Sequence, residues 1–145
     1  MSSTTFTVHT SLSPGDLLAV ITDFGPDRSR WWPNVDAEHF TVHDQGPGWA
    51  EVTEGTSMGW ERERYSWDAA AGTVTIDTLE SNLWAPGSSW RYELLPAGGG
   101  TDLRVSLKRL PTSFNGRIVA ALIPVVGRRV LAKQFETVLR RAEGR

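Results

Sequence analysis

The sequence predicts an α+β fold with an antiparallel sheet of about seven strands, two short helices after the first strand and a long C-terminal helix. Short runs up to position 109 alternate apolar and polar residues, as strands with one buried and one solvent-facing side do. Turns rich in glycine and proline separate these runs. After Pro111 the apolar period becomes helical. Strands segregated from helices in this way are typical of α+β proteins.

The first third of the chain predicts one strand and two short helices. Alternation over 6–10 indicates the strand. Ser13 is a suitable N-cap and Pro14 a suitable first helical residue, so we expect a helix from there to about position 21, before Gly25-Pro26. A further helical turn is expected over 27–32, and Pro33 ends it.

Six more strands are expected before a kinked helix. Their predicted ranges are 38–43, 49–54, 60–67, 73–81, 88–95 and 101–109. Thr112 or Ser113 then caps a helix that runs to about position 142. Its first apolar stripe, which includes Ile118, Leu122 and Val125, is out of register with the later one. Pro124 and Gly127 lie between the two stripes and predict a kink there.

Length and composition set limits on function. A chain of 145 residues suits a single domain over 1–145. It has no cysteine, which excludes disulfides and thiolate sites and fits a cytoplasmic protein. A net charge of −2 gives no basic field for nucleic acid. No apolar run is long enough to predict an integral membrane segment.

The predicted element order resembles the helix-grip fold of the START-like (SRPBCC) superfamily, and within it the polyketide cyclase/dehydratase and lipid-transport family. The resemblance implies a curved sheet that wraps around the long helix, with a pocket between them. Because members include aromatase/cyclases and lipid carriers, it assigns no reaction. The motifs that carry it are Ser13-Pro14, Thr22-Asp23-Phe24, Arg30-Trp31-Trp32-Pro33, Glu63-Arg64-Tyr65-Ser66-Trp67-Asp68 and Gly99-Gly100-Thr101.

The seven tryptophans suggest an aromatic core or a ligand surface. Within the implied fold, alternation assigns the residues that face the pocket. Either Trp31 or Trp32 lies at its mouth, or both pack under the sheet as core. Trp84, in a loop, is expected to contact ligand or form a homodimer interface. The expected ligand-binding residues are Trp31, Trp32, Tyr65, Trp67, Ile76, Trp84, Trp90, Tyr92, Val105, Ile118, Leu122 and Val125.

The fourth strand decides how polar the pocket is. We expect the face with Glu63, Tyr65 and Trp67 to be inside, because it buries more apolar area than the other face. Burial would then raise the pKa of Glu63, which would act as a general acid or base together with Tyr92. Alternatively, Glu63 pairs with an arginine of a neighbouring strand. The reverse arrangement would place Arg62 and Arg64 in the pocket and favour an anionic ligand.

Neither a metal site nor a cofactor motif is predicted. His39 and His43, if both lie on the strand over 38–43, are about 13 Å apart and cannot share one metal ion. The serines lack the G-x-S-x-G turn of a nucleophile, and the glycines over 98–100 lack the lysine of a phosphate loop.

Three functions are compatible with these residues. The leading hypothesis is that a small hydrophobic ligand (lipid, isoprenoid/quinone or polyketide) binds in the internal pocket. The second is a polyketide aromatase/cyclase or dehydratase that uses Glu63 and Tyr92 for proton transfer. The third is a protein-interaction or co-chaperone module that uses the Trp84 loop and the basic helix end, with Arg128, Arg129, Lys133, Arg140 and Arg141.

Overall fold

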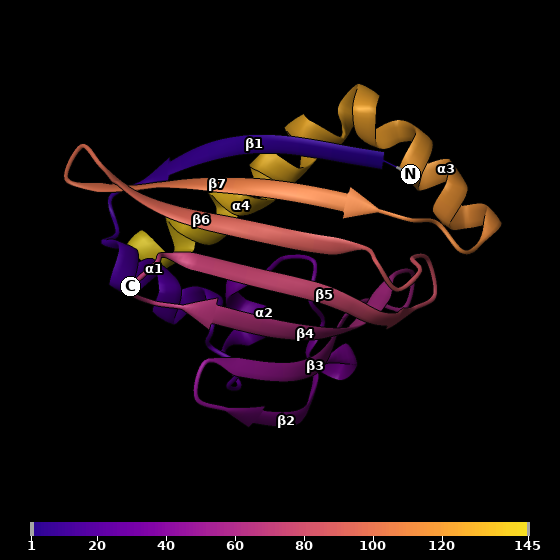
Figure 1. Cartoon of the computed structure of the whole chain (residues 1–145), viewed down its shortest axis with the longest axis horizontal. Helices are drawn as coiled ribbons and strands as arrows, with labels where there is room; N and C mark the ends of the chain where they lie inside the picture. Colours follow the sequence, from indigo (N-terminus) through magenta and orange to yellow (C-terminus); the bar gives the residue numbers. More distant parts are fainter. Residues whose placement is uncertain (1, 145) are drawn as a thin grey trace.

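The computed structural model describes residues 2–144 as a seven-stranded antiparallel sheet with helices on one face (Figure 1). The strand order is β1-β7-β6-β5-β4-β3-β2, so the first strand, β1 (Ser2–Thr10), lies beside the last, β7 (Gly100–Arg109). This confirms the predicted sheet. The strands between them in sequence are β2 (Thr41–Gly46), β3 (Trp49–Gly55), β4 (Trp60–Asp68), β5 (Thr73–Ser81) and β6 (Ser89–Ala97).

The two short helices after β1 form as expected. In α1 (Pro14–Ile21) the Ser13 side chain accepts a hydrogen bond from the Asp16 backbone N–H at 3.1 Å, and Pro14 occupies the first turn. Leu17, Val20 and Ile21 are buried from this helix. The single-turn helix α2 (Arg28–Trp31) follows and buries Arg28.

The C-terminal helix bends in its middle. It consists of α3 (Phe114–Leu122), the π-helical turn η2 (Ile123–Gly127) and α4 (Arg128–Glu143). Figure 1 shows α3 and α4 running in different directions, with α4 crossing behind the sheet. The π-helical turn is the kink predicted from Pro124 and Gly127, since a widened turn accommodates a proline and redirects a helix.

The core lies between α4 and the sheet. Phe135, Val138, Leu139 and Ala142 are buried on α4 and pack against the inward residues of the strands. Inward residues alternate along β3, β5 and β7, as the apolar pattern predicted. Within 2–144, no helix is both long and apolar enough to cross a membrane.

The second strand begins later than predicted. The segment Ala37–His39 is a 3-10 helix, η1, whose His39 N–H donates to the Asp36 carbonyl at 2.9 Å. The prediction that His39 and His43 share a strand was therefore wrong. Strand β2 instead extends to Gly46, and the turn to β3 is tight because Gly48 adopts a positive φ of 76°.

The buried side of α3 also differs from the prediction. Ile118, Leu122 and Val125 are exposed, whereas Gly116 and Ala120 are buried. The cause is a close approach, because a Cβ at Gly116 would lie 2.3 Å from the Leu83 carbonyl oxygen. The helix therefore packs through its small residues, and its larger apolar side chains point outward.

Candidate functional site

The fourth strand turns Glu63 and Tyr65 inward, each only 4% exposed. The expected buried face is therefore confirmed, and the reverse arrangement with two arginines inside is wrong. Arg62 instead pairs with Glu51 of β3 at 2.5 Å, and the guanidinium of Arg64 lies over the exposed side of the sheet, 4.5 Å from the ring centroid of Trp49.

A buried ion pair lies beneath these residues. Arg28, 1% exposed, comes from α2, and its Nε donates to the Glu54 carboxylate of β3 at 3.0 Å. Its Nη2 donates to the Tyr65 hydroxyl at 2.8 Å, and that hydroxyl in turn donates to Glu54. Further donation to the Ile21 carbonyl at 2.6 Å ties the pair to the end of α1.

Neither Arg28 nor Glu54 was predicted from the sequence. A signal for Glu54 existed, because it follows Ala50 and Val52 at a spacing of two and so shares their inward face. An acidic residue at such a position needs a buried partner. Arg28 had no comparable signal, since a helix of one turn has too little apolar periodicity to orient its side chains.

The two buried carboxyl groups have opposite protonation preferences. Burial raises the pKa of Glu63 well above the ordinary value, and the charges of Glu61 and Glu54 raise it further. Burial also disfavours ionisation of Glu54, but the charge of Arg28 and the hydrogen bonds from Arg28 and Tyr65 help to outweigh it, so the pKa of Glu54 is lowered. The interaction between the two groups lowers the pKa of Glu54 and raises that of Glu63. Glu63 is therefore the protonated group of the pair and Glu54 the ionised one.

A cavity of about 180 Å³ opens above this cluster. We call it the inner cavity. Its polar wall consists of Arg28, Glu54, Glu63, Tyr65 and Tyr92, and its apolar wall includes Trp32, Ile76, Trp90 and Phe135. Burial also raises the pKa of the Tyr92 hydroxyl well above its usual value, with Glu63 and Glu54 adding to the effect, so that hydroxyl stays neutral.

A second cavity of about 370 Å³ adjoins the first. We call it the outer cavity. Its wall is mainly apolar and includes Leu83, Trp84, Leu107, Leu122, Ile123 and Val126. Both cavities are lined by Asn34, Gly59, Glu61, Trp90 and Gln134, so they meet along these residues.

A second ion pair stands where the two cavities meet. Arg109 of β7 binds Glu61 of β4 through both terminal nitrogens, at 2.5 and 3.0 Å. Its guanidinium also lies near the faces of two rings, 5.1 Å from the centroid of Trp84 and 5.0 Å from that of Trp90. These contacts fix the aromatic wall between the polar and the apolar space.

The structure places the expected ligand-binding residues in several environments. Trp32, Tyr65, Ile76, Trp90 and Tyr92 line the inner cavity, and Trp84, Trp90 and Leu122 line the outer one. The remaining five, which line neither cavity, are Trp31, Trp67, Val105, Ile118 and Val125.

Each of these five residues lies outside the cavities for a structural reason. Val105 of β7 is fully buried in the core between α4 and the sheet. Trp67 packs on Phe24, with ring centroids 6.1 Å apart. The Trp31 indole N–H donates to Asp23 at 3.2 Å. Ile118 and Val125 face outward because α3 packs through its small residues and the π-helical turn follows it.

Trp84 is not the exposed loop residue that the sequence suggested. It is 7% exposed, because its loop pairs with the chain after β7. The Ala85 N–H donates to the Leu110 carbonyl at 2.6 Å, and the Thr112 N–H donates to the Leu83 carbonyl at 3.0 Å. The ring therefore forms part of the cavity wall.

Glu63→Gln is expected to flatten the pH dependence of stability above the pKa of an unfolded carboxyl group, about 4.3. Since the folded pKa of Glu63 is raised, its stabilising contribution is complete below the unfolded value and is lost as the pH rises through the folded value. Glutamine keeps the shape without ionising. Urea unfolding over this range should show that the free energy of unfolding of the variant rises relative to that of the wild type as the pH rises. The control Glu80→Gln, at an exposed residue, should show the same pH dependence as the wild type. A constant difference would contradict the assignment.

Comparison with known proteins finds similar structures but no similar sequences. No family model and no curated protein matches the chain. Among solved structures, it is similar to a Thermus thermophilus protein with a TM-score of 0.79, 13% identity, and coverage of 98% of this chain and 97% of that one. The Zhui aromatase/cyclase of Streptomyces sp. R1128 has a TM-score of 0.78 and 16% identity, and the match covers 97% of this chain and 93% of that one. A START superfamily protein of Mycobacterium smegmatis has a TM-score of 0.77 and 15% identity, and the match covers 99% of each chain.

The chain therefore has the START-like (SRPBCC) fold of the helix-grip type, as the sequence motifs had implied. At these identities the likeness establishes the fold, and the function has to be argued from the two cavities.

Proposed function

We propose that this protein binds a small, largely apolar organic molecule that carries a hydrogen-bonding oxygen at one end. Lipids, isoprenoid quinones and polyketides belong to this class. The supporting observation is the pair of adjoining cavities, one polar and buried, the other apolar. A molecule that spans both would place its oxygen near Glu63 and its hydrocarbon part against Trp84 and Leu122.

The inner cavity favours an acceptor oxygen such as that of a ketone. Protonated Glu63 is a donor there. Trp32 also lines this cavity, is 7% exposed, and has an indole N–H that is buried without a hydrogen-bond partner among the described residues. Buried donors nearly always have a partner, so we infer that a small rotation of the ring offers this N–H to a ligand atom when the cavity is filled. A carbonyl oxygen would satisfy it.

Two matched probes test this preference. Tetralone and tetralin are bicyclic molecules that differ by one ketone oxygen, and quenching of tryptophan fluorescence reports binding of each. We expect the wild type to favour tetralone and Trp32→Phe to weaken tetralone binding about 2- to 10-fold, the factor for one neutral hydrogen bond. Binding of tetralin should not change. If Trp32→Phe binds tetralone as the wild type does, the proposed acceptor contact is wrong.

A second candidate function, a polyketide aromatase/cyclase or dehydratase, is favoured by the carboxyl pair. Ring closure and dehydration of a poly-β-ketone need one group that protonates an oxygen and another that removes a proton from carbon. Protonated Glu63 and ionised Glu54 supply these roles, with the neutral Tyr92 hydroxyl as a further donor. The solved structure of an aromatase/cyclase with the same fold supports this candidate.

The Glu63→Gln variant separates the two functions. It keeps a donor at the inner cavity but cannot deliver a proton, so binding of tetralone should persist. If the protein is a cyclase, the variant should lose conversion of an acyclic poly-β-ketone thioester to an aromatic product, followed by absorbance. Equal conversion by both proteins would exclude Glu63 as the acid.

A further inference from the structure

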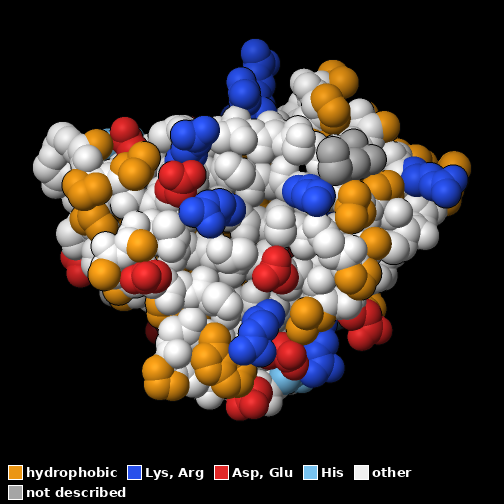
Figure 2. All heavy atoms as spheres, in the orientation of Figure 1, with side chains coloured by type: hydrophobic (Ala, Val, Ile, Leu, Met, Phe, Trp, Pro, Cys, Tyr) orange, Lys and Arg blue, Asp and Glu red, His pale blue; other side chains and the backbone are white. Residues whose placement is uncertain are grey.

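The outer side of α3, η2 and the start of α4 exposes a continuous series of large apolar side chains. Such residues usually point inward, and a patch of them on the surface of a monomer marks an interaction site. Figure 2 shows hydrophobic side chains gathered over α3 beside a basic side chain at its outer end. The exposed residues are Phe114, Ile118, Val119, Leu122, Val125, Val126 and Val130, and we call them the apolar helix face.

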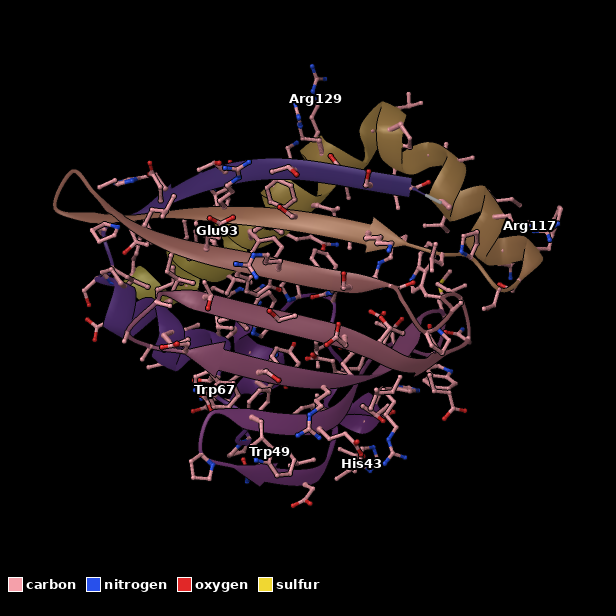
Figure 3. The ribbon with its side chains drawn as sticks, viewed as in Figure 1. His43, Trp49, Trp67, Glu93, Arg117 and Arg129 are labelled. Atoms are coloured by element: carbon pink, nitrogen blue, oxygen red, sulfur yellow. The ribbon has the colours of Figure 1, made fainter. Side chains whose placement is uncertain are left out.

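The helical segment that carries this face has only basic charges. The sequence has no Asp or Glu between Asp102 and Glu136, although the whole chain has a net charge of −2. In Figure 3, Arg117 extends from the outer end of α3 and Arg129 points away from the sheet. The exposed basic residues between Phe114 and Lys133 are Arg117, Arg128, Arg129 and Lys133.

The apolar helix face also forms one side of the outer cavity. Val119, Leu122, Val126 and Val130 are exposed and line that cavity at the same time. An apolar molecule that enters or leaves the cavity beside them would therefore pass next to whatever covers the face.

From these observations we propose that the apolar helix face docks on an anionic lipid surface. Aliphatic side chains and Phe114 would enter the boundary between headgroups and acyl chains, and the basic residues would contact lipid phosphates. The outer cavity would then open toward the membrane, so that an apolar ligand could move between the two without crossing water.

A second copy of the chain is a poorer occupant. Pairing this face with itself would bring Arg117, Arg128, Arg129 and Lys133 of two copies together with no acidic residue on the face to neutralise them. Leu and Val are also under-represented in the binding hot spots of protein interfaces, and most residues of this face are of these two types.

Co-sedimentation with vesicles tests the proposal. The full chain should pellet with vesicles of equal parts phosphatidylcholine and phosphatidylglycerol and stay in solution with phosphatidylcholine alone. Added salt should weaken the binding. Equal sedimentation with both vesicles, or with neither, would overturn the proposal.

Variants locate the contact. Phe114 and Val125 are 76% and 78% exposed and line neither cavity, so the double change Phe114→Asp, Val125→Asp should abolish sedimentation and leave tetralone binding unchanged. Met58→Asp, at an equally exposed apolar residue between β3 and β4, is the control and should bind vesicles as the wild type does.

The charge contribution has its own pair of variants. Arg129→Gln should weaken vesicle binding about fivefold, the factor that corresponds to about 1 kcal/mol per basic residue at an anionic surface. Arg91→Gln, at an exposed residue of β6, is the control and should leave vesicle binding unchanged. A dimer in light scattering that the double aspartate variant abolishes would instead identify the face as a homodimer interface and overturn the proposal.

Discussion

Replacing Arg28 by methionine is expected to lower the free energy of unfolding by about 3–5 kcal/mol, the cost of leaving a buried charge without its partner. Arg28 is 1% exposed and holds Glu54, Tyr65 and the end of α1 together. Methionine fills similar space but donates no hydrogen bond, so the Glu54 carboxylate is stranded in the core. Urea unfolding at neutral pH measures the loss.

Arg30→Met is the matched control. Arg30 lies two residues away, is largely exposed, and its side chain pairs with Asp27 at 3.2 Å on the surface. Such pairs contribute about 0–1 kcal/mol. The loss caused by Arg28→Met should also shrink at acidic pH, where Glu54 takes up a proton and no longer needs a cation. Equal losses for the two variants would contradict the buried cluster described above.

Phe135→Ala is the second change with a large expected effect, about 3–5 kcal/mol of stability. This ring projects from α4 into the inner cavity wall and meets four aromatic rings at centroid distances of 5.5 to 6.0 Å. Truncation removes the contacts with Phe6, Trp32, Trp90 and Tyr92 and leaves a void beside the cavity.

Phe114→Ala provides the comparison, because Phe114 is 76% exposed on α3. A surface truncation of this kind should change stability by less than about 0.5 kcal/mol. Thermal or urea unfolding of both variants distinguishes the two environments. A small loss for Phe135→Ala would mean that α4 does not pack on the sheet through this ring.

Periodicity predicted the sheet well because most strands have one buried face, and alternation then fixes which residues point inward. It also placed Glu63, Tyr65 and Tyr92 on the inward face. The buried side of the helix at 114–127 was harder to predict. There the residues that decide packing are Gly116 and Ala120, whose small size lets the loop at Leu83 approach, and a search for apolar stripes does not detect small residues.

The polar part of the site depended on long-range pairing that a sequence pattern does not encode. Arg28 and Glu54 are 26 residues apart and meet only because the fold brings the side chain of α2 to the inward face of β3. Arg109 and Glu61 are 48 residues apart and meet across β4 to β7. Sequence alternation found the faces of the strands, but it could not tell which charges on those faces would neutralise one another.

The central claim is that the two adjoining cavities hold a small, apolar, oxygen-bearing molecule. Native mass spectrometry of the full chain, purified from cells and then mixed with tetralone, tests it most directly. We predict either a co-purifying small molecule that organic extraction releases or a one-to-one complex with tetralone that tetralin forms less readily. A protein that carries no molecule and forms no complex with either probe would contradict the account.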